Sequence, residues 1–240
     1  MTGWNGLNTA YFTEDKDDPI YTALVKAIVE RKLLPGSKLP EEALADVFAV
    51  SRTGIRRVLQ RLAAVQLVTH LPKRGAHVAT PDADESRDVM ATRKILECTN
   101  MSEVIAQCRP SHIEALSKIL EQEKQAHDNH DGTAAIRLSA AFHVQLQAIS
   151  GNKVLTETVS QLTLRSSLVI AAWGAPWQQG CRCHDHDDLL DVLKRGDSAA
   201  LSCRMSEHFD AILASLRFDP HQGTPTAFEE IFKSTPRVSL

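Results

Sequence analysis

The sequence predicts a mainly α protein in which a winged helix-turn-helix with a small β-hairpin wing precedes an all-α helical bundle. Three observations predict it. Residues 20–62 contain three short segments with apolar residues at helical spacing. Residues 67–79 contain two runs rich in β-branched side chains around a Pro-Lys-Arg-Gly turn. Residues 84–217 then show helical spacing throughout, with Gly, Asn or Pro at most of the junctions.

The composition limits the class of protein. The chain has 240 residues, 43% of them hydrophobic and 24% charged, which is typical of a soluble globular protein of one large or two ordinary domains. Because no apolar run approaches membrane-spanning length and the N-terminus lacks the apolar core of a signal peptide, we expect a cytoplasmic protein with no membrane partner. The cysteines form an odd set, which favours reduced thiols over a disulfide framework. They are Cys98, Cys108, Cys181, Cys183 and Cys203.

Charge is unevenly distributed along the chain. Residues 21–80 hold ten Lys and Arg against four Asp and Glu, a net charge of +6. Since the whole chain carries −3, the remainder carries −9. A basic N-terminal third joined to an acidic remainder suggests a nucleic-acid module attached to a second function.

The basic third begins with two short helices. We expect the first from about Ile20 to Arg31, ended by the turn residues Leu34-Pro35-Gly36. The second is expected from about Glu41 to Phe48. Ala49-Val50-Ser51 then leads tightly into the next helix, which makes a helix-turn-helix.

The helix expected over residues 51–62 has two faces of different character. Ser51 stands at the N-cap position, where its hydroxyl can accept from the first free backbone N–H groups. One face repeats apolar residues at i, i+3, i+4 and i+7 and is expected to pack on the core. The opposite face carries Arg52, Thr53, Arg56, Arg57, Gln60 and Arg61. Arginines after a helix N-terminus suit phosphate and can read guanine edges in the major groove, although a solvated face is the usual fate of such a run.

Two strands are expected after this helix, at Leu67–Leu71 and Ala76–Ala79, with Pro72-Lys73-Arg74-Gly75 as the turn between them. Three helices followed by a hairpin with a basic tip follow the order of a winged helix. Lys73 and Arg74 would then lie beside the DNA backbone or in the minor groove. The predicted DNA-binding residues are Ser51, Arg52, Thr53, Arg56, Arg57, Gln60, Lys73, Arg74 and Gly75.

Several ordered motifs in residues 20–80 carry a resemblance. They are Leu33-Leu34-Pro35-Gly36, Glu42-Ala43-Leu44-Ala45, Val50-Ser51-Arg52-Thr53, Ile55-Arg56 and the wing residue Gly75. With them the segment resembles the DNA-binding domain of the GntR family of bacterial transcription regulators. This chain departs from the family at Gly54, where a proline is common, and at Arg57, where a glutamate is common. Gly54 should loosen the first helical turn by under about 1 kcal/mol, and Arg57 adds a cation that could alter the preferred operator.

The remainder of the chain is expected to be helical. Candidate helices are 84–107, 111–128, 132–149, 152–173, 183–195 and 197–217. The chain is thus divided into a tail at 1–17, a winged helix-turn-helix at 18–80, a linker at 81–85, a helical domain at 86–218 and a second tail at 219–240.

Three histidines of the helical region are candidates for one site. Phe142-His143 lies in the third candidate helix, His186 near the start of the fifth and His208 in the sixth. Antiparallel neighbouring helices can bring such side chains to one level, where three imidazoles could bind a divalent transition metal. Each histidine taken singly is more often a structural or surface residue.

A second set of motifs lies in residues 86–215. It consists of Arg93 and Glu97, Phe142-His143, Gly151-Asn152, His186 with Leu189-Leu190, Gly196-Asp197, and Glu207-His208. With it the region resembles the FCD domain, the all-helical ligand-binding domain of the FadR-type branch of the GntR family. The resemblance implies an effector-binding and dimerisation domain, which in many members has a metal site of one aspartate and three histidines.

This chain has Ser139 at the position of the family's aspartate, four residues before His143. Serine is a poor metal ligand, so the site loses its one anionic donor. The three histidines could still hold zinc or nickel, with water or an effector carboxylate in the open position, or could bind an acidic effector without metal. Arg93 suits an effector carboxylate, with a salt bridge to Glu97 as the alternative. The expected effector-binding residues are Arg93, Ser139, His143, His186 and His208.

Two other features of the helical region are weaker indications of a functional site. Cys181-Arg182-Cys183-His184-Asp185-His186 is a weak metal motif, because no second cysteine pair stands at zinc-finger spacing. We expect an exposed loop there, with redox sensing as the alternative. Trp173 and Trp177 flank a Gly174-Ala175-Pro176 break and are expected to be packing residues.

The sequence therefore predicts a ligand-responsive, sequence-specific DNA-binding regulator and not an enzyme. As a homodimer it would place two copies of the 51–62 helix in successive major grooves of a near-palindromic double-stranded operator, with repression the commoner mode in the families it resembles. The expected effector is a small carboxylate, such as a sugar acid, hydroxy acid or amino-acid derivative. The alternatives are a metal-dependent, hydrolase-like enzyme using the three histidines, for which a general base is lacking, and a non-specific DNA-binding protein.

Overall fold

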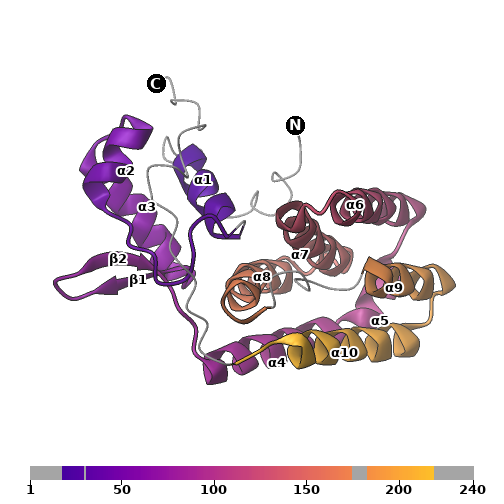
Figure 1. The fold of residues 1–240 in the computed structure, drawn as a ribbon. Helices are drawn as coiled ribbons and strands as arrows, with labels where there is room; N and C mark the ends of the chain where they lie inside the picture. Colours follow the sequence, from indigo (N-terminus) through magenta and orange to yellow (C-terminus); the bar gives the residue numbers. More distant parts are fainter. Residues whose placement is uncertain (1–17, 30, 175–182, 219–240) are drawn as a thin grey trace.

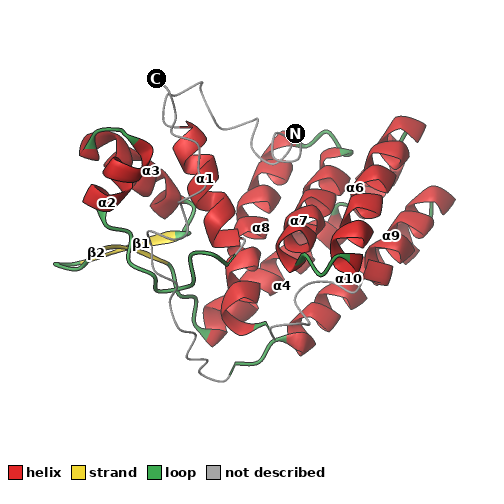
Figure 2. Ribbon diagram, turned by 45° about the horizontal axis from the view of Figure 1, so that its top comes forward, coloured by secondary structure: helices red, strands yellow, loops and turns green. Residues whose placement is uncertain are grey.

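The computed structural model describes residues 18–29, 31–174 and 183–218. The expectations for the two tails, for Cys181 and for Trp177 lie outside these residues. Helices make up most of the described chain, together with a two-stranded antiparallel sheet, as Figures 1 and 2 show. The predicted mainly α class is confirmed. Among the described residues, none of the helices is both long and apolar enough to cross a membrane.

The N-terminal part consists of three helices and a hairpin. They are α1 (Asp18–Val29), α2 (Glu41–Phe48), α3 (Arg52–Ala64), β1 (Val68–Leu71) and β2 (Gly75–Val78). These are the predicted elements in the predicted order, and α2 has the predicted ends. The first helix ends at Val29 rather than at Arg31. Arg31 adopts a left-handed conformation (φ 55°), and its N–H returns to the Ile28 carbonyl, which closes the helix.

A hydrophobic cluster holds the winged helix together. Leu24 of α1, Leu44 of α2 and Leu59 of α3 are fully buried in it. The sheet adds Val68 and Val78, which face each other across the antiparallel ladder. Because these side chains recur at helical spacing in the helices and at alternate positions in β2, their pattern alone predicts which faces are buried.

The sheet has a further contact that the sequence did not reveal. Residues 37–39 lie against the other edge of β2, where the Leu39 N–H donates to the Ala76 carbonyl and the Val78 N–H donates to the Ser37 carbonyl, both at 2.9 Å. A segment of three residues is too short to show the alternation that identifies a strand. Only the docking of the chain after α1 reveals it.

The rest of the described chain forms a helical domain. Its helices are α4 (Ala83–Thr99), α5 (Met101–Gln107), α6 (Pro110–Asp128), α7 (Gly132–Ala148), α8 (Lys153–Trp173), α9 (Cys183–Arg195) and α10 (Ser198–Ser215). The prediction of one helix over 84–107 was wrong, because the chain breaks at Asn100. The buried side chain of Asn100 donates to Gln147 Oε1 at 2.8 Å, so the break is fixed by a contact with α7. The other helices begin and end within two residues of their predicted limits.

The connection between the two parts is short and partly buried. Asp82 caps α4 by accepting from the Glu85 N–H at 2.8 Å, so residues 83–85 of the predicted linker are helical. Just before it, the Pro81 carbonyl accepts from Trp173 Nε1 at 3.1 Å. Trp173 also packs on Phe218, which agrees with its predicted packing role.

Helix α8 lies between the winged helix and the rest of the helical domain. Figures 1 and 2 show it beside α1 on one side and α7 on the other. Its Leu164 and Leu168 belong to the hydrophobic cluster of the winged helix. Near its C-terminus, the Ala171 carbonyl accepts from the Arg31 guanidinium at 2.7 Å. The two parts are therefore joined by a packed interface with α8 at its centre.

Candidate DNA interface and effector pocket

Helix α3 presents its basic face to solvent. The Ser51 hydroxyl accepts from the Gly54 N–H at 3.2 Å, which confirms the predicted N-cap. Ile55 and Leu59 on the opposite face are fully buried. The residues of this helix and its cap that were predicted to contact DNA are all exposed, namely Ser51, Arg52, Thr53, Arg56, Arg57 and Gln60. Arg61 is less exposed, because its guanidinium lies 4.8 Å from the centre of the Tyr21 ring.

Arg56 has a partner that sequence reasoning missed. Its Nε and Nη2 donate to the two carboxylate oxygens of Glu41 at 3.1 and 2.7 Å, and the same carboxylate lies 4.0 Å from Arg52. The hydrogen bond from Arg56 lowers the pKa of Glu41. Glu41 is the first residue of α2, so only the packing of α2 against α3 brings it here. The contact holds the Arg56 guanidinium in place on the exposed face.

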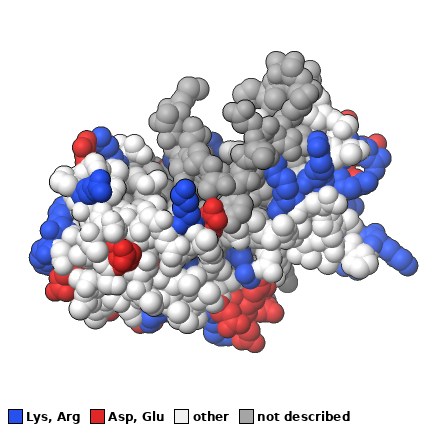
Figure 3. Space-filling view, turned by 180° about the vertical axis from the view of Figure 1, so that it is seen from behind, with Lys and Arg blue, Asp and Glu red and all other residues white. Residues whose placement is uncertain are grey.

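The tip of the hairpin carries the other predicted DNA-binding residues. The Arg74 N–H returns to the Leu71 carbonyl at 3.0 Å, and Lys73 takes a left-handed conformation (φ 63°), as in a type II turn with Pro72 and Lys73 at its centre. Gly75 follows with φ 84°, a conformation that strains any residue with a side chain. Figure 3 shows Lys and Arg side chains over the winged-helix side of the molecule, including its projecting hairpin. Such a surface suits a polyanion.

The three candidate histidines meet inside the helical domain. His143 of α7, His186 of α9 and His208 of α10 are buried, and each offers a ligand atom within 4.8 Å of the others. The Nε2 atoms of His143 and His208 are 3.1 Å apart. In a tetrahedral zinc site with bonds of about 2.0–2.1 Å, two ligand nitrogens lie about 3.3 Å apart. The predicted convergence of these side chains is confirmed, and the Nε2 atoms of His143 and His208, which are also within hydrogen-bond distance, are about as far apart as two ligands of one metal ion. We call these three residues the histidine cluster.

A carboxylate lies at the Nδ1 atom of every histidine in the cluster. The pairs are Glu97 with His143 at 2.7 Å, Glu123 with His186 at 2.8 Å, and Asp185 with His208 at 3.6 Å. At His143 and His186 the carboxylate is within hydrogen-bond distance, and a carboxylate that accepts from Nδ1–H fixes the tautomer and leaves Nε2 as the metal-binding atom, an arrangement common behind zinc-bound histidines. Sequence reasoning missed these roles of Glu97, Glu123 and Asp185, because nothing near them in the chain marks a histidine as their partner.

Arg93 lies beside this cluster. Its Nε donates to Glu97 at 2.8 Å, so the ion pair considered as the alternative for Arg93 is present. Both side chains are buried, at 4% and 0% exposure. Burial raises the pKa of Glu97, but the charges of Arg93 and His143 more than offset this, and the pKa falls to about 2. The Nη2 atom of Arg93 is buried without a hydrogen-bond partner.

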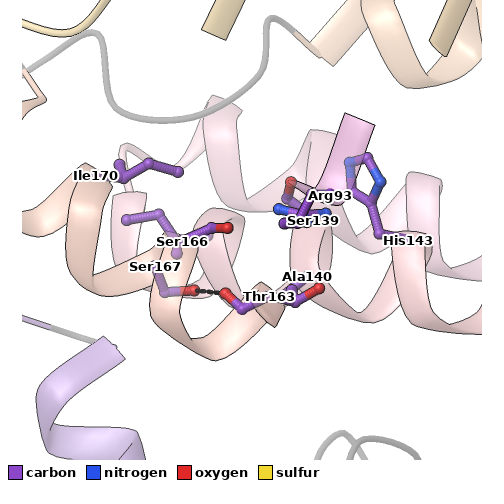
Figure 4. Close-up of a pocket in the computed structure, with 9 residues that line it drawn as sticks. Arg93, Ser139, Ala140, His143, Thr163, Ser166, Ser167 and Ile170 are labelled. Carbon is purple, nitrogen blue, oxygen red and sulfur yellow. Dashed lines mark hydrogen bonds between the residues drawn. The ribbon is translucent and has the colours of Figure 1, made fainter. Parts of the chain in front are cut away.

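A pocket opens between α4, α7 and α8 (Figure 4), and the space of about 280 Å³ between its lining atoms includes open solvent. It brings together Arg93, Ser139 and His143 of the predicted effector site, whereas His186 and His208 do not line it. Its opposite wall belongs to α8 and was missed from the sequence. That wall consists of Thr163, Ser166, Ser167 and Ile170. Small hydroxyl residues in a buried helix carry no local signal that separates a pocket wall from ordinary packing.

The cysteines whose side chains the structure describes form no second site. Cys98, Cys108 and Cys203 are free thiols. Burial, followed by the charge of Glu97, raises the pKa of Cys98 to about 11. A raised pKa disfavours the thiolate, which is the reactive form of cysteine.

The fold and these sites define a winged-helix DNA-binding module joined to a helical domain with a pocket lined by polar and apolar side chains. Comparison with known families identifies both parts. Residues 16–78 match the family described as "Bacterial regulatory proteins, gntR family", and residues 88–211 match the FCD domain. The chain belongs to the GntR family of bacterial regulators and carries an FCD domain.

Individual relatives agree with this assignment. The chain is 30% identical to the HTH-type transcriptional regulator YdhC of Bacillus subtilis (strain 168), over 83% of this chain and 92% of that one. It is 29% identical to the galactonate operon transcriptional repressor of Escherichia coli (strain K12), over 78% and 91%. It is 24% identical to the HTH-type transcriptional repressor RspR of the same organism, over 85% and 90%. The chain is thus a DNA-binding transcription regulator, and none of these relatives supports the hydrolase-like alternative.

Solved structures agree on the fold. A GntR-type transcriptional regulator from Rhodococcus sp. RHA1 superposes with a TM-score of 0.75 at 20% identity, covering 83% of this chain and 96% of that one. E. coli McbR/YncC superposes with a TM-score of 0.74 at 21% identity, covering 84% and 98%. The arrangement of the winged helix and the helical domain is therefore shared at low sequence identity.

Proposed function

We propose that this regulator is a ligand-responsive repressor that binds a near-palindromic operator as a homodimer. Each copy would place α3 in the major groove and the hairpin tip at the backbone or in the minor groove. The exposure of the α3 arginines supports this, since the Arg52 and Arg56 side chains are 62% and 55% exposed on a helix whose other face is buried. Repression is the mode in the names of two relatives, RspR and the galactonate operon repressor.

The effector proposal rests on one observation, the unpaired end of Arg93. Its Nε is held by Glu97, while its buried Nη2 has no hydrogen-bond partner and the side chain lines the pocket. A buried donor without a partner costs about 1–3 kcal/mol. A carboxylate fits the planar fork of a guanidinium better than other small groups do. We infer a small carboxylate effector in contact with Arg93, Ser139 and His143.

The histidine cluster would hold a divalent metal beside this effector. Three imidazoles, two of them hydrogen-bonded through Nδ1 to a carboxylate, are a donor set that suits zinc or nickel. With Ser139 in place of an aspartate, the protein would supply no carboxylate ligand from that position, which would leave room for the effector's carboxylate. When bound, the metal supplies a cationic, Lewis-acidic attachment for the effector's carboxylate. His186 and His208 would then contribute to effector binding through the metal.

The proposed route from pocket to DNA is α8. One face of this helix lines the pocket, and the neighbouring face packs on the winged helix through Leu164 and Leu168. Ile170 takes part in both contacts. A ligand that shifts α8 would therefore change the position of the winged helix relative to the helical domain. Coupling free energies between two such sites are typically about 1–3 kcal/mol and are reciprocal.

The test uses the full chain, its operator and a panel of sugar acids, hydroxy acids and amino-acid derivatives in a gel-shift titration. At least one class should release the operator. Arg93→Lys keeps a charge beside Glu97 but loses the fork, so release should need at least about tenfold more ligand. Arg87→Lys, an exposed arginine on the same helix, is the control. Equal ligand requirements in wild type and Arg93→Lys would refute the pocket assignment.

The metal is tested separately. Crystals of protein loaded with zinc or nickel should show an anomalous scattering peak between His143, His186 and His208. A loaded crystal with no peak there would contradict the metal proposal and favour direct binding of the effector by the histidines.

A further inference from the structure

The α8 wall of the pocket consists of hydroxyl side chains on one helix face. Thr163, Ser166 and Ser167 stand at i, i+3 and i+4, and Ile170 completes the face at i+7. The three hydroxyl residues are at most 3% exposed. Figure 4 shows them on one side of the pocket, with Arg93, Ser139 and His143 on the other. The two sides therefore differ in chemistry, with a cation and an imidazole opposite three hydroxyls.

Each of these hydroxyls has already used its one donor. The acceptors are the carbonyl oxygens four residues earlier: Val159 for Thr163 at 2.7 Å, Leu162 for Ser166 at 2.8 Å and Thr163 for Ser167 at 3.1 Å. A hydroxyl carries one O–H donor and two acceptor lone pairs. With the donors engaged, the wall offers acceptors to a ligand.

Packing alone does not require hydroxyl residues at these positions. Serine and threonine that bond back to the carbonyl at i−4 slightly destabilise and bend a helix. Alanine or valine would fill the same space and bring no polar atom into the pocket. Three hydroxyls on one buried face therefore fit a wall that is used by a polar ligand.

We infer that this wall selects, among small carboxylates, those that carry hydroxyl groups. The inference rests on the proposed function, since Arg93 must hold the carboxylate for the rest of the molecule to reach α8. A ligand hydroxyl can donate to the lone pairs of Thr163, Ser166 and Ser167, whereas an unsubstituted aliphatic acid cannot. Among the described residues that line the pocket there is no Asp or Glu, so a buried ammonium group would lack an anionic partner. Hydroxy acids are thus favoured over amino-acid derivatives.

Two matched sets of ligands test this by calorimetry on the full chain at one fixed zinc concentration. Glycerate, serine and propionate are carboxylates of three carbons. Glycerate carries two hydroxyls, serine carries one hydroxyl and one ammonium group, and propionate carries no such substituent. Gluconate and hexanoate make the same comparison with six carbons. In at least one set the hydroxy acid should bind at least about tenfold more tightly than the parent acid, and glycerate more tightly than serine.

The triple variant Thr163→Val/Ser166→Ala/Ser167→Ala should reduce that preference to under about threefold while leaving the Kd of the parent acid nearly unchanged. Thr158→Val is the matched control, because Thr158 makes the same bond to the Val154 carbonyl on an exposed part of α8. A melting curve establishes that each variant is folded.

The outcomes separate the two proposals. If hydroxy acid and parent acid bind wild type equally and Arg93→Lys weakens both, the selective wall is refuted and the Arg93 site stands. If the triple variant weakens all acids alike, the hydroxyls are structural and the inference is overturned. If no carboxylate of either set binds wild type, the carboxylate pocket itself is wrong and the inference falls with it.

Discussion

The winged helix exposes Arg52 and Arg56 to solvent, whereas the helical domain buries the ion pair of Arg93 and Glu97. Arg52 and Arg56 extend from α3 into solvent, where both form ion pairs with the Glu41 carboxylate. Arg93 and Glu97 are shielded from solvent beside the histidine cluster. Exposed cations are screened and gain free energy when a polyanion replaces their counterions. Buried charges bear a desolvation cost of several kcal/mol and persist only when they are paired.

This difference assigns different partners to the two regions. A surface of exposed cations can accept a large, continuous anion such as DNA with little rearrangement. A buried site accepts only a ligand that completes the hydrogen bonds left open, such as that of Arg93 Nη2. Arginine therefore makes a broad electrostatic contact with DNA in the winged helix and a small, specific contact with a ligand in the helical domain.

The largest expected effect comes from reversing charge on α3. The double variant Arg52→Glu/Arg56→Glu should lower operator affinity at least about a thousandfold, to the level of non-specific DNA. Gel-shift titration measures the loss, and size-exclusion chromatography should show an unchanged oligomeric state. Lys194→Glu/Arg204→Glu makes the same change of charge in the helical domain and should leave operator binding close to wild type. Wild-type affinity in the α3 variant would refute α3 as the recognition helix.

Next in size is the loss of the buried carboxylate. Glu97→Leu leaves the Arg93 charge unpaired in the interior and should lower the free energy of unfolding by about 3–5 kcal/mol. Adding Arg93→Met should recover most of that loss, because neither charge then remains buried. Glu207→Ala, which breaks the exposed pair with Arg204, should cost less than about 1 kcal/mol. Urea denaturation measures all three, and a small effect of Glu97→Leu would show that water reaches the site.

A smaller change concerns the metal. Ser139→Asp places a carboxylate one helical turn before His143 and should tighten zinc or nickel binding at least about tenfold. Competition with a chromophoric chelator measures the affinity. His143→Ala is expected to remove metal binding altogether and therefore serves as the negative control. An unchanged affinity in Ser139→Asp would mean that the histidine cluster does not use that position.

The smallest expected effect lies at the interface between the two regions. Arg31→Met removes the hydrogen bond to the Ala171 carbonyl of α8 and should lower the coupling between effector and operator by about 0.5–2 kcal/mol. The measurement is operator affinity with and without effector, so that the ratio isolates coupling from binding. Lys32→Met removes the same charge from the next, exposed position and is the control. Equal coupling in the two variants would exclude this contact from the route.

Local signals in the sequence were sufficient for most of the winged helix. Ser51, the helical spacing of Ile55 and Leu59, and the turn before Gly75 each act within a few residues, so propensity and periodicity reveal them. The meeting of His143, His186 and His208 was also predicted, but from antiparallel helix geometry and family resemblance together. The break at Asn100 was missed, because its buried partner Gln147 belongs to another helix.

The sequence by itself determined the fold class, the basic surface of α3 and the identity of the clustered histidines. Three features were decided only by the tertiary structure. Glu41 pairs with Arg56, carboxylates lie beside the histidine cluster, and hydroxyl side chains of α8 line the pocket. Glu97 and His143 are 46 residues apart in the chain, and Glu123 and His186 are 63 apart. Such pairs form when packing removes water from both partners, which makes pairing favourable over separation. That event depends on the whole fold and has no signal at either residue.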